Sequence, residues 1–521
     1  MSRPGSSSSD PAEATSGHAN PVAVRVGLSG ATVAHLPDTV AIPAYDRRAV
    51  STGIVHIGVG NFHRAHQALY IDRCLHLPGQ HGWGIVGVGL GDGPDKRDKA
   101  RAFTAQNGLY TLTEYAPDGG VETRVIGALL DYLHAPTQTE AVLDRLAHPD
   151  TRIVSLTITE GGYNLDEATG AFVLSTPAVR RDLADPHRPR TAFGFIVEAL
   201  ARRRAAGLGG FTVLSCDNLR SNGRVARKAV LSFAKARDED LAAWIDTAVR
   251  FPNSMVDRIA PTVSPEERRR VNERTGIEDA LPVIAESFIQ WVVEDTFIAG
   301  RPALDRVGVQ LRDDIERFEA IKGRVLNASH MMLSYPALLC GYRLVHEAMG
   351  QPAIAAYLEA FMDADVIPLI EGPEGVSLQA YKRHILERFA NPAIGDQLLR
   401  IAGNGVAKLP IFLSTTLAQL VERGGGYARV ALCLACFARY LTGRDLQGGP
   451  LVVDEPLLTD RDRALLASGD PLAVLRLSAF AALGLSSSAA FKDAFLAARA
   501  RLAAEGPMAA LAFAATEGSR R

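Results

Sequence analysis

The sequence has few cysteines, no long hydrophobic run and almost no net charge. Five cysteines among 521 residues do not make a disulfide framework, so we expect a reducing, cytoplasmic location. No apolar stretch reaches the ~18 residues that cross a bilayer, and the N-terminus lacks the apolar core of a secretory signal. The 56 basic and 58 acidic residues leave a formal net charge of −2, which argues against nucleic acid or a membrane surface as a partner.

The N-terminal segment also has little hydrophobic sequence. Its first twenty or so residues are rich in Ser, Pro, Gly and Ala, a composition that buries too little apolar surface to fold, and we expect a poorly ordered tail over residues 1–45. The whole chain is 47% hydrophobic and 22% charged, as in ordinary globular proteins, and its length predicts two or three domains.

Short apolar runs alternate with helical patterns from about residue 50 to residue 300. Runs rich in β-branched residues predict buried strands at 53–60, 84–90, 152–159 and 211–216. Helical patterns lie between them at 67–77, 139–146 and 193–206. This alternation predicts an α/β fold, with a Rossmann-type doubly wound sheet domain over residues 46–312.

The pattern becomes mostly helical from about residue 313, which predicts an α-helical C-terminal domain over 313–521. Long Ala/Leu-rich helical patterns lie at 313–346, 352–361, 378–390, 427–441 and 471–483. Cys433 and Cys436 fall within one of them without a second pair, so we interpret them as core residues and not as a zinc or redox motif.

The first predicted strand leads into the turn G-V-G-N-F-H-R-A-H, residues 58–66, and a helical pattern follows. Gly58 allows a tight turn, and Gly60 lets the backbone approach a pyrophosphate at the start of the helix. The usual third glycine is missing, since Phe62 stands in that region. A tight turn alone is a weak signal, but this one opens the first βαβ unit and predicts a dinucleotide site that includes Asn61 and Phe62. We assign the histidines of this motif, His63 and His66, to the same turn and not to a metal site.

Acidic and basic residues follow the second predicted strand. An acidic residue there usually binds the ribose of the adenosine and favours NAD over NADP. Asp92 and Asp95 both qualify, and we favour Asp95. Lys96 and Arg97 are the alternative, because they can accept a 2′-phosphate.

The segment E-A-I-K-G-R-V-L-N-A-S-H, residues 319–330, is the sharper chemical signal. At ~100° per residue, Lys322, Asn327 and His330 lie on one side of a helix, with Glu319 in the same arc. The alternative is a solvated face with a Glu319–Lys322 ion pair. Apolar neighbours, however, predict that much of the helix is buried, and buried polar groups need partners or a function.

These residue types suit the oxidation of a secondary alcohol by NAD. A lysine whose pKa is lowered by desolvation can accept the hydroxyl proton as the hydride leaves carbon. Asparagine amides can stabilise an alkoxide or a polarised carbonyl, and a histidine can orient the hydroxyl. This chemistry needs no metal.

Seven motifs spread over the chain from about residue 50 resemble the polyol-specific long-chain dehydrogenase/reductase family. They are I-G-V-G-N-F-H-R-A-H-Q (57–67), Q-N-G-L-Y-T-L-T-E (106–114), T-I-T-E-G-G-Y-N (157–164), L-S-C-D-N-L (214–219), F-P-N-S-M-V-D-R-I (251–259), W-V-V-E-D-x-F (291–297) and K-x4-N-x2-H (322–330). The resemblance implies a Rossmann domain joined to a helical substrate-binding and catalytic domain, with the active site between them.

The resemblance also implies roles for individual residues. Lys322 corresponds to the general base, Asn218 and Asn327 to an oxyanion hole, and His330 to a residue that positions the substrate. Asp257 corresponds to a residue where nicotinamide and substrate meet. Substrate hydroxyls would be held by Arg400 and Lys408, and a proton path to the base would be lined by Glu160 and Glu319.

The implied activity is the reversible oxidation of a polyol to a ketose, which depends on NAD and needs no metal. The resemblance favours D-mannitol and D-fructose as the pair of substrates, and it implies a monomeric enzyme. Oxidation of D-arabinitol at C4 and reduction of fructuronate are alternatives within the family. A non-catalytic NAD-binding sensor is the alternative from another class, and it would have no use for Lys322. A zinc-dependent alcohol dehydrogenase is disfavoured because no Cys/His/Glu ligand set is found.

Overall fold

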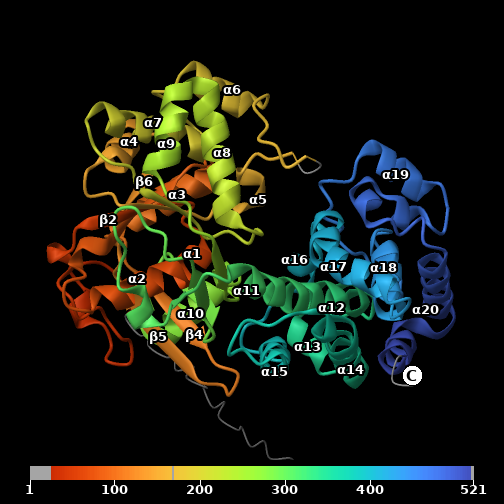
Figure 1. The fold of residues 1–521 in the computed structure, drawn as a ribbon. Helices are drawn as coiled ribbons and strands as arrows, with labels where there is room; N and C mark the ends of the chain where they lie inside the picture. The colour runs from red at the N-terminus through yellow and green to blue at the C-terminus, as the bar shows by residue number, and fades with distance from the viewer. Residues whose placement is uncertain (1–24, 167–168, 518–521) are drawn as a thin grey trace, which may run out of the picture.

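The computed structural model describes residues 25–166 and 169–517 of the chain. It has two lobes, and the strands of the described residues all lie in the first of them (Figure 1). The run of helix that includes α11 (Ile315–Ile321) and α12 (Ala328–Leu339) passes from the first lobe into the second.

A five-stranded parallel sheet forms the centre of the first lobe, in the order β6-β3-β2-β7-β8. Its strands are β2 (Thr52–Ile57), β3 (Gly84–Gly89), β6 (Leu129–His134), β7 (Ile153–Leu156) and β8 (Thr212–Ser215). This is the 3-2-1-4-5 order of a Rossmann fold, so the predicted doubly wound sheet is confirmed. The order reverses between β2 and β7, and ligands of such sheets bind at the carboxyl ends of these strands.

Helices cover both faces of the sheet because both faces of its strands are apolar. Val55 and Val86 pack on one side, and Ile54 and Ile85 on the other. The first layer contains α4 (Thr139–Ala147), α7 (Ala192–Ala205), α8 (Asn222–Arg237) and α9 (Glu239–Ala248). The second contains α1 (Asn61–Ala65), α2 (Gln67–Leu75) and α3 (Pro94–Ala105).

Two small sheets, which the sequence analysis did not predict, extend the second layer. One has the order β11-β4-β5 and the other β13-β12-β9. Their strands are β4 (Tyr110–Tyr115), β5 (Val121–Ile126), β9 (Ser254–Asp257), β11 (Val283–Glu286), β12 (Gln290–Val293) and β13 (Gln310–Leu311). Strands β9 and β11 end at Asp257 and Glu286, which places both carboxyl groups at the site described below.

Part of the segment predicted as a poorly ordered tail is folded. Residues 25–45 are packed on the first lobe, where β1 (Val26–Gly27) pairs with β10 (Ile277–Glu278). Leu28, Leu36 and Val40 are buried in a small cluster with the distant residues Leu109, Val125 and Ile277. These side chains are too widely spaced to form a periodic pattern, which is why the composition of the segment suggested a tail. Residues 1–24 lie outside the described part of the chain.

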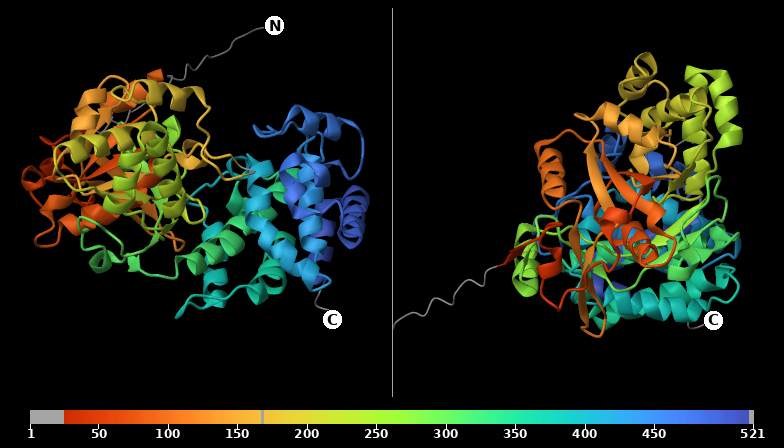
Figure 2. Two further views of the ribbon diagram at one scale, coloured as in Figure 1. Left: turned by 45° about the horizontal axis from the view of Figure 1, so that its top comes forward. Right: turned by 90° about the vertical axis from the view of Figure 1, so that its left-hand side faces the viewer.

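The second lobe is helical around one large apolar core, as predicted. Besides α11 and α12 it contains α13 (Val345–Met349), α14 (Pro352–Ala360), α15 (Leu378–Phe389), α16 (Leu398–Ala402), α17 (Gly405–Glu422), α18 (Ala428–Tyr440), α19 (Asp460–Ala467) and α20 (Ala489–Thr516, broken at Gly506). The predicted helix at 471–483 is a pair of short 3-10 turns instead. Cys433 and Cys436 are buried in the core on α18. The two lobes also lie side by side in the left view of Figure 2. Within the described residues, no helix combines the length and apolarity that a membrane crossing needs.

Candidate active site

The glycine turn lies at the carboxyl end of β2, beside β7. Gly58 has a φ of 101°, and a Cβ there would lie 2.1 Å from the carbonyl oxygen of Thr157, so only glycine fits. A Cβ on Gly60 would meet no atom closer than 3.9 Å, which leaves room for a pyrophosphate against the backbone. Sequence reasoning missed Lys99 on α3, whose Nζ donates to the carbonyl of Val59 inside the turn. Burial lowers the pKa of Lys99 to about 7.

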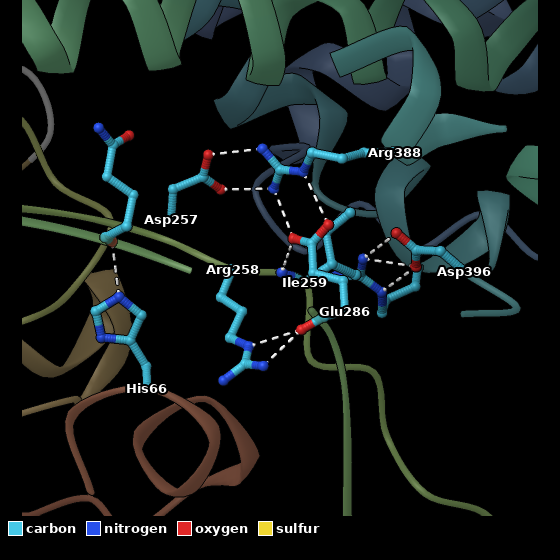
Figure 3. Close-up of polar contacts among 9 residues, drawn as sticks. His66, Asp257, Arg258, Ile259, Glu286, Arg388 and Asp396 are labelled. Atoms are coloured by element: carbon cyan, nitrogen blue, oxygen red, sulfur yellow. Dashed lines mark hydrogen bonds and ion pairs between the residues drawn. The ribbon is translucent and has the colours of Figure 1, made fainter. Parts of the chain in front are cut away.

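The residues that follow the glycines anchor the turn to the neighbouring sheet. The Asn61 amide donates to the Pro261 carbonyl at 3.0 Å. The Phe62 ring stacks on His66 with 5.0 Å between centroids. His66 in turn bonds the Gln290 carbonyl through Nε2 at 2.8 Å (Figure 3). Among the described residues, no group of three or more His, Cys, Asp and Glu side chains is arranged to hold a metal ion.

Both candidate acids for the adenosine ribose lie after β3, and each is paired with a neighbouring cation. Asp95, exposed at the start of α3, contacts Lys96 Nζ at 2.7 Å. Asp92 accepts a hydrogen bond from Arg97 at 2.8 Å. The structure therefore places acids and cations together at this end of the site.

Lys322 begins a π-helix, Lys322–Asn327, that joins α11 to α12. A π-helix repeats after about five residues, so Asn327 lies one turn from Lys322 on the same side of the helix. The two residues are therefore closer in angle than the 100° spacing of an α-helix predicted, and His330 follows in the first turn of α12.

Lys322 reaches across to the first lobe. Its Nζ donates to Asn218 Oδ1 at 2.7 Å, in the loop after β8. Burial lowers the pKa of Lys322, and the negative charge of Asp257, followed by those of Glu319 and Glu160, opposes the shift. The structure thus brings four of the predicted site residues, Asn218, Asp257, Glu319 and Glu160, around Lys322.

Glu319 and Glu160 approach Lys322 from different elements. The Glu319 carboxylate accepts the backbone N–H of Ser221 at 2.9 Å, and burial raises its pKa to about 7. Glu160 is exposed in the short helix α5 (Thr159–Gly162). Asp217, which sequence reasoning missed, accepts the backbone N–H groups of Ile158 and Thr159 at 3.0 and 2.9 Å and so fixes this loop.

His330 is held by stacking. Its ring lies 4.2 Å from that of Phe389, centroid to centroid, with 14° between the planes. Burial lowers the pKa of His330 to about 4, so the ring is neutral at ordinary pH. Its Nε2 is buried and has no hydrogen-bond partner among the residues that the structure describes, which leaves this atom free to bond a ligand.

The two cations predicted to hold substrate lie close to each other. Arg400 forms hydrogen bonds of 2.7–3.0 Å with Asp396 while its side chain remains 51% exposed. Lys408 Nζ donates to the Ile401 carbonyl at 3.2 Å. Burial, and then the positive charge of Arg400, lower the pKa of Lys408.

Asp257 is buried in an ion-pair network that sequence reasoning did not find (Figure 3). Arg388 of α15 bonds both its oxygens, at 2.8 and 2.9 Å, and also bonds Glu286. Only the folded chain reveals these contacts, since an arginine near the end of a helix carries no signal of its own.

The comparisons with known proteins identify the family of the chain. Residues 52–306 match the family described as the mannitol dehydrogenase Rossmann domain, and residues 314–503 match the mannitol dehydrogenase C-terminal domain. A polyol:NADP oxidoreductase of Gluconobacter oxydans is 48% identical over 86% of this chain and 92% of its own. A mannitol 2-dehydrogenase of Phaeosphaeria nodorum is 42% identical over 84% of this chain and 77% of its own.

Solved structures give the same result. The Pseudomonas fluorescens mannitol 2-dehydrogenase, solved as a ternary complex with NAD and D-mannitol, superposes with a TM-score of 0.87 at 41% identity over 94% of this chain and all of its own. A D-sorbitol dehydrogenase in substrate-free form gives 0.85 at 44% identity, over 93% of this chain and all of its own. The chain therefore belongs to the mannitol dehydrogenase family, as an oxidoreductase with a pyridine nucleotide-binding Rossmann domain.

Proposed function

We propose that the protein catalyses the reversible oxidation of a polyol secondary alcohol to a ketose with NAD, with D-mannitol and D-fructose as the preferred pair. The observation that carries the proposal is the 2.7 Å hydrogen bond from Lys322 Nζ to Asn218, because it sets a lysine of lowered pKa beside a carboxamide. A sensor that only binds NAD would have no use for this pair. The mannitol 2-dehydrogenase relatives, one of them solved with NAD and D-mannitol, support the choice of substrate.

In the proposed mechanism, Lys322 is the general base. In its neutral form it accepts the hydroxyl proton, and in its charged form it returns that proton during ketone reduction. Asn218 accepts from Lys322 through Oδ1, so its amide nitrogen remains to donate to the substrate oxygen together with Asn327. The neutral ring of His330 orients the hydroxyl. The turn from Gly58 to Phe62 would hold NAD, which would supply the hydride acceptor.

The remaining predicted residues serve proton transfer and substrate binding in this proposal. Glu319 and Glu160 connect Lys322 to solvent, and a carboxyl with a pKa of about 7 suits Glu319 to that task. Arg400 and Lys408 hold the distal hydroxyls. Asp257 would lie where the nicotinamide and the substrate meet, and the proposed mechanism uses no metal. The monomeric state and the cytoplasmic location stay predictions.

Two observations favour a second candidate, a polyol dehydrogenase that uses NADP or prefers another polyol. The relative named polyol:NADP oxidoreductase is 48% identical, and Lys96 and Arg97 stand beside Asp95 and Asp92. The structure named D-sorbitol dehydrogenase is 44% identical, so D-sorbitol joins D-arabinitol and fructuronate among the alternative substrates.

A substrate and cofactor screen tests the proposal. Purified protein is assayed with mannitol, sorbitol, arabinitol, fructose and fructuronate, each with NAD(H) and NADP(H), with and without a chelator. We expect the highest kcat/KM for mannitol and fructose with the NAD couple, unchanged by the chelator. A higher value for another polyol or for NADP would replace that part of the proposal, and loss of turnover in the chelator, restored by zinc, would refute the metal-free mechanism.

The role of the lysine has its own test. Lys322→Ala should lower turnover by ~10²–10⁴-fold, the usual contribution of a positioned base, while the NAD affinity measured by fluorescence titration stays near the wild-type value. Wild-type oxidation kinetics in this variant would place the base elsewhere.

A further inference from the structure

Arg388 is an enclosed positive charge at the boundary between the two lobes. It lies near the end of α15 with its side chain 1% exposed, and it bonds two carboxylates of the first lobe. Its NH1 and NH2 reach Asp257 at 2.8 and 2.9 Å, and its Nε and NH2 reach Glu286 at 2.8 and 2.6 Å (Figure 3). Four charge-assisted hydrogen bonds on one planar guanidinium fix its position more strictly than one ion pair does.

The first lobe holds these carboxylates in place. Asp257 and Glu286 are the last residues of β9 and β11. Glu286 also accepts the backbone N–H of Ile259 at 2.6 Å, and Arg258 Nε donates to its carbonyl oxygen at 3.0 Å. Arg388 therefore binds two carboxylates that the backbone of the first lobe already holds in place. A lysine could not bridge both in this way, because it lacks the planar, forked guanidinium.

The same end of α15 contacts the site a second time. Phe389, the next residue, stacks on His330 at 4.2 Å. The ring of Phe288 lies 4.3 Å from the guanidinium of Arg388. The last two residues of this helix thus contact two members of the proposed site. Arg388 binds the charged Asp257, and Phe389 stacks on the neutral His330.

The charges of the network act on Lys322. Asp257, Glu286 and Arg388 together carry one net negative charge, so a protonated Lys322 makes the group neutral. Burial opposes ionisation of Asp257, but Arg388 and Lys322 hold its pKa below the usual value. The charged and titratable groups that face Lys322 are Asp257 from β9, Arg388 from α15, Glu319 from α11, Glu160 from α5 and His66 from between α1 and α2.

We propose that Arg388 is a positioning residue of the active site, which holds the Asp257 carboxylate beside Lys322 and couples the helical lobe to the Rossmann domain at that point. This inference rests on the proposed function, since Arg388 acts through the proposed base. Through the same contacts it sets how much of the Asp257 charge Lys322 experiences.

Two substitutions of opposite charge separate this role from simple packing. Arg388→Met leaves two adjoining carboxylates, and the proton they then share goes to Glu286, whose pKa burial already raises. Asp257 stays ionised, and the positive charge of Arg388, which lowers the pKa of Lys322, is gone, so Lys322 should lose its proton at higher pH. Glu286→Gln removes a negative charge instead and leaves Arg388 less neutralised, so Lys322 should lose its proton at lower pH. We expect displacements of about 0.5–1 pH unit in opposite directions.

The test measures two midpoints in each variant. The first is the midpoint of kcat for polyol oxidation against pH. The second is the pH midpoint for acylation of Lys322 by an amine-reactive acylating reagent, which is measured by mass spectrometry of the peptide that contains Lys322. This measurement needs no turnover. Arg388→Lys should return the first midpoint toward the wild-type value, because the charge is restored, while kcat stays lower, because the fork is not. Arg317→Met is the matched control, since Arg317 is exposed and pairs with exposed Glu371 at 3.0 Å, and it should move neither midpoint.

Opposite displacements in Arg388→Met and Glu286→Gln support the positioning role. Midpoints that stay at the wild-type value, or move in the same direction in both variants, overturn it. If Arg388→Met does not fold, Glu286→Gln and Arg388→Lys decide the question. A midpoint at lower pH in Glu286→Gln together with a lowered kcat in Arg388→Lys supports the positioning role, and wild-type values of both overturn it. If the wild-type protein oxidises no polyol but the acylation midpoints still move apart, the proposed function fails and the coupling of Arg388 to Lys322 stands.

Discussion

Replacing Glu319 by glutamine should move polyol oxidation toward lower pH. Glu319 lies one turn before Lys322, and burial raises its pKa to about 7. Above that pH its carboxylate is ionised, and this negative charge opposes loss of the proton from Lys322, whose pKa burial lowers. Glutamine keeps an oxygen that can accept the Ser221 N–H but carries no charge, so Lys322 should become neutral at a lower pH.

The size of the shift follows from the ranking of charges around Lys322. A lysine with the ordinary pKa of ~10.4 is neutral in about one molecule in 2,500 at pH 7, and each unit of lowering raises that fraction tenfold. A close opposite charge shifts a pKa by ~1–3 units, and Glu319 acts on Lys322 more weakly than Asp257 does. We therefore expect a displacement of about 0.5–1 unit, which is a ~3–10-fold faster oxidation on the rising limb.

The assay is kcat for oxidation and for reduction between about pH 6 and 11. The midpoint reports the charge effect, and the plateau reports any loss of the proposed proton path through Glu319. Glu316→Gln is the matched control. Glu316 lies on the same helix but is exposed, and it accepts a hydrogen bond of 2.7 Å from Arg224. A midpoint in Glu319→Gln that equals the wild-type value, or lies above it, would refute the reasoning.

Three further predictions concern the cofactor turn, the substrate histidine and the helical core. Gly58→Ala should lower the melting temperature because its Cβ would overlap backbone, whereas Gly60→Ala should keep the melting temperature and weaken NAD binding ~10-fold or more in a titration. His330→Asn should raise KM while leaving each ionisation of the pH profile in place, because the ring is already neutral; a lost ionisation between pH 6 and 7 would contradict this. Arg429 is buried and donates two hydrogen bonds, of 2.6 and 2.7 Å, to the Asp365 carboxylate. Asp365→Asn removes this charged partner and should lower the free energy of unfolding, measured in urea, by about 3–5 kcal/mol; a loss below ~1 kcal/mol would show that the ion pair is dispensable.

The sequence predicted the central sheet better than its surroundings. Strands β2, β3, β7 and β8 are buried on both faces and so are apolar runs rich in β-branched residues, and their predicted ends differ from those in the structure by at most three residues. Strands β9, β11 and β12 have four residues each and pair with strands that are distant in the sequence. They are too short to show a local sequence pattern that would predict them. The packed segment at 25–45 was missed because its few apolar side chains are buried singly, in contacts with distant residues.

The candidate site shows the same division. Lys322, Asn327 and His330 were identified because they share one helical segment, although the π-helix that brings the first two closer has no sequence signature. Asn218 and Asp257 came only from the resemblance, since nothing in their spacing connects them with Lys322. Arg388 was not predicted, because its proposed role depends on contacts with the ends of two strands that lie more than 100 residues earlier in the chain.

Each proposed step of proton transfer depends on contacts between the two lobes. Lys322 belongs to the helical run, but its hydrogen-bond partner Asn218 follows β8 in the first lobe. Asp257, the charge that most opposes its lowered pKa, also belongs to the first lobe and is held by Arg388 of the second. Separation of the lobes would therefore remove the amide partner of the base and expose Lys322 to water, which restores an ordinary lysine pKa and leaves the base protonated at neutral pH. The lobes must be packed together before this lysine can act as a base, so substitutions that loosen the contact at Arg388 should impair oxidation even where the nucleotide turn is intact.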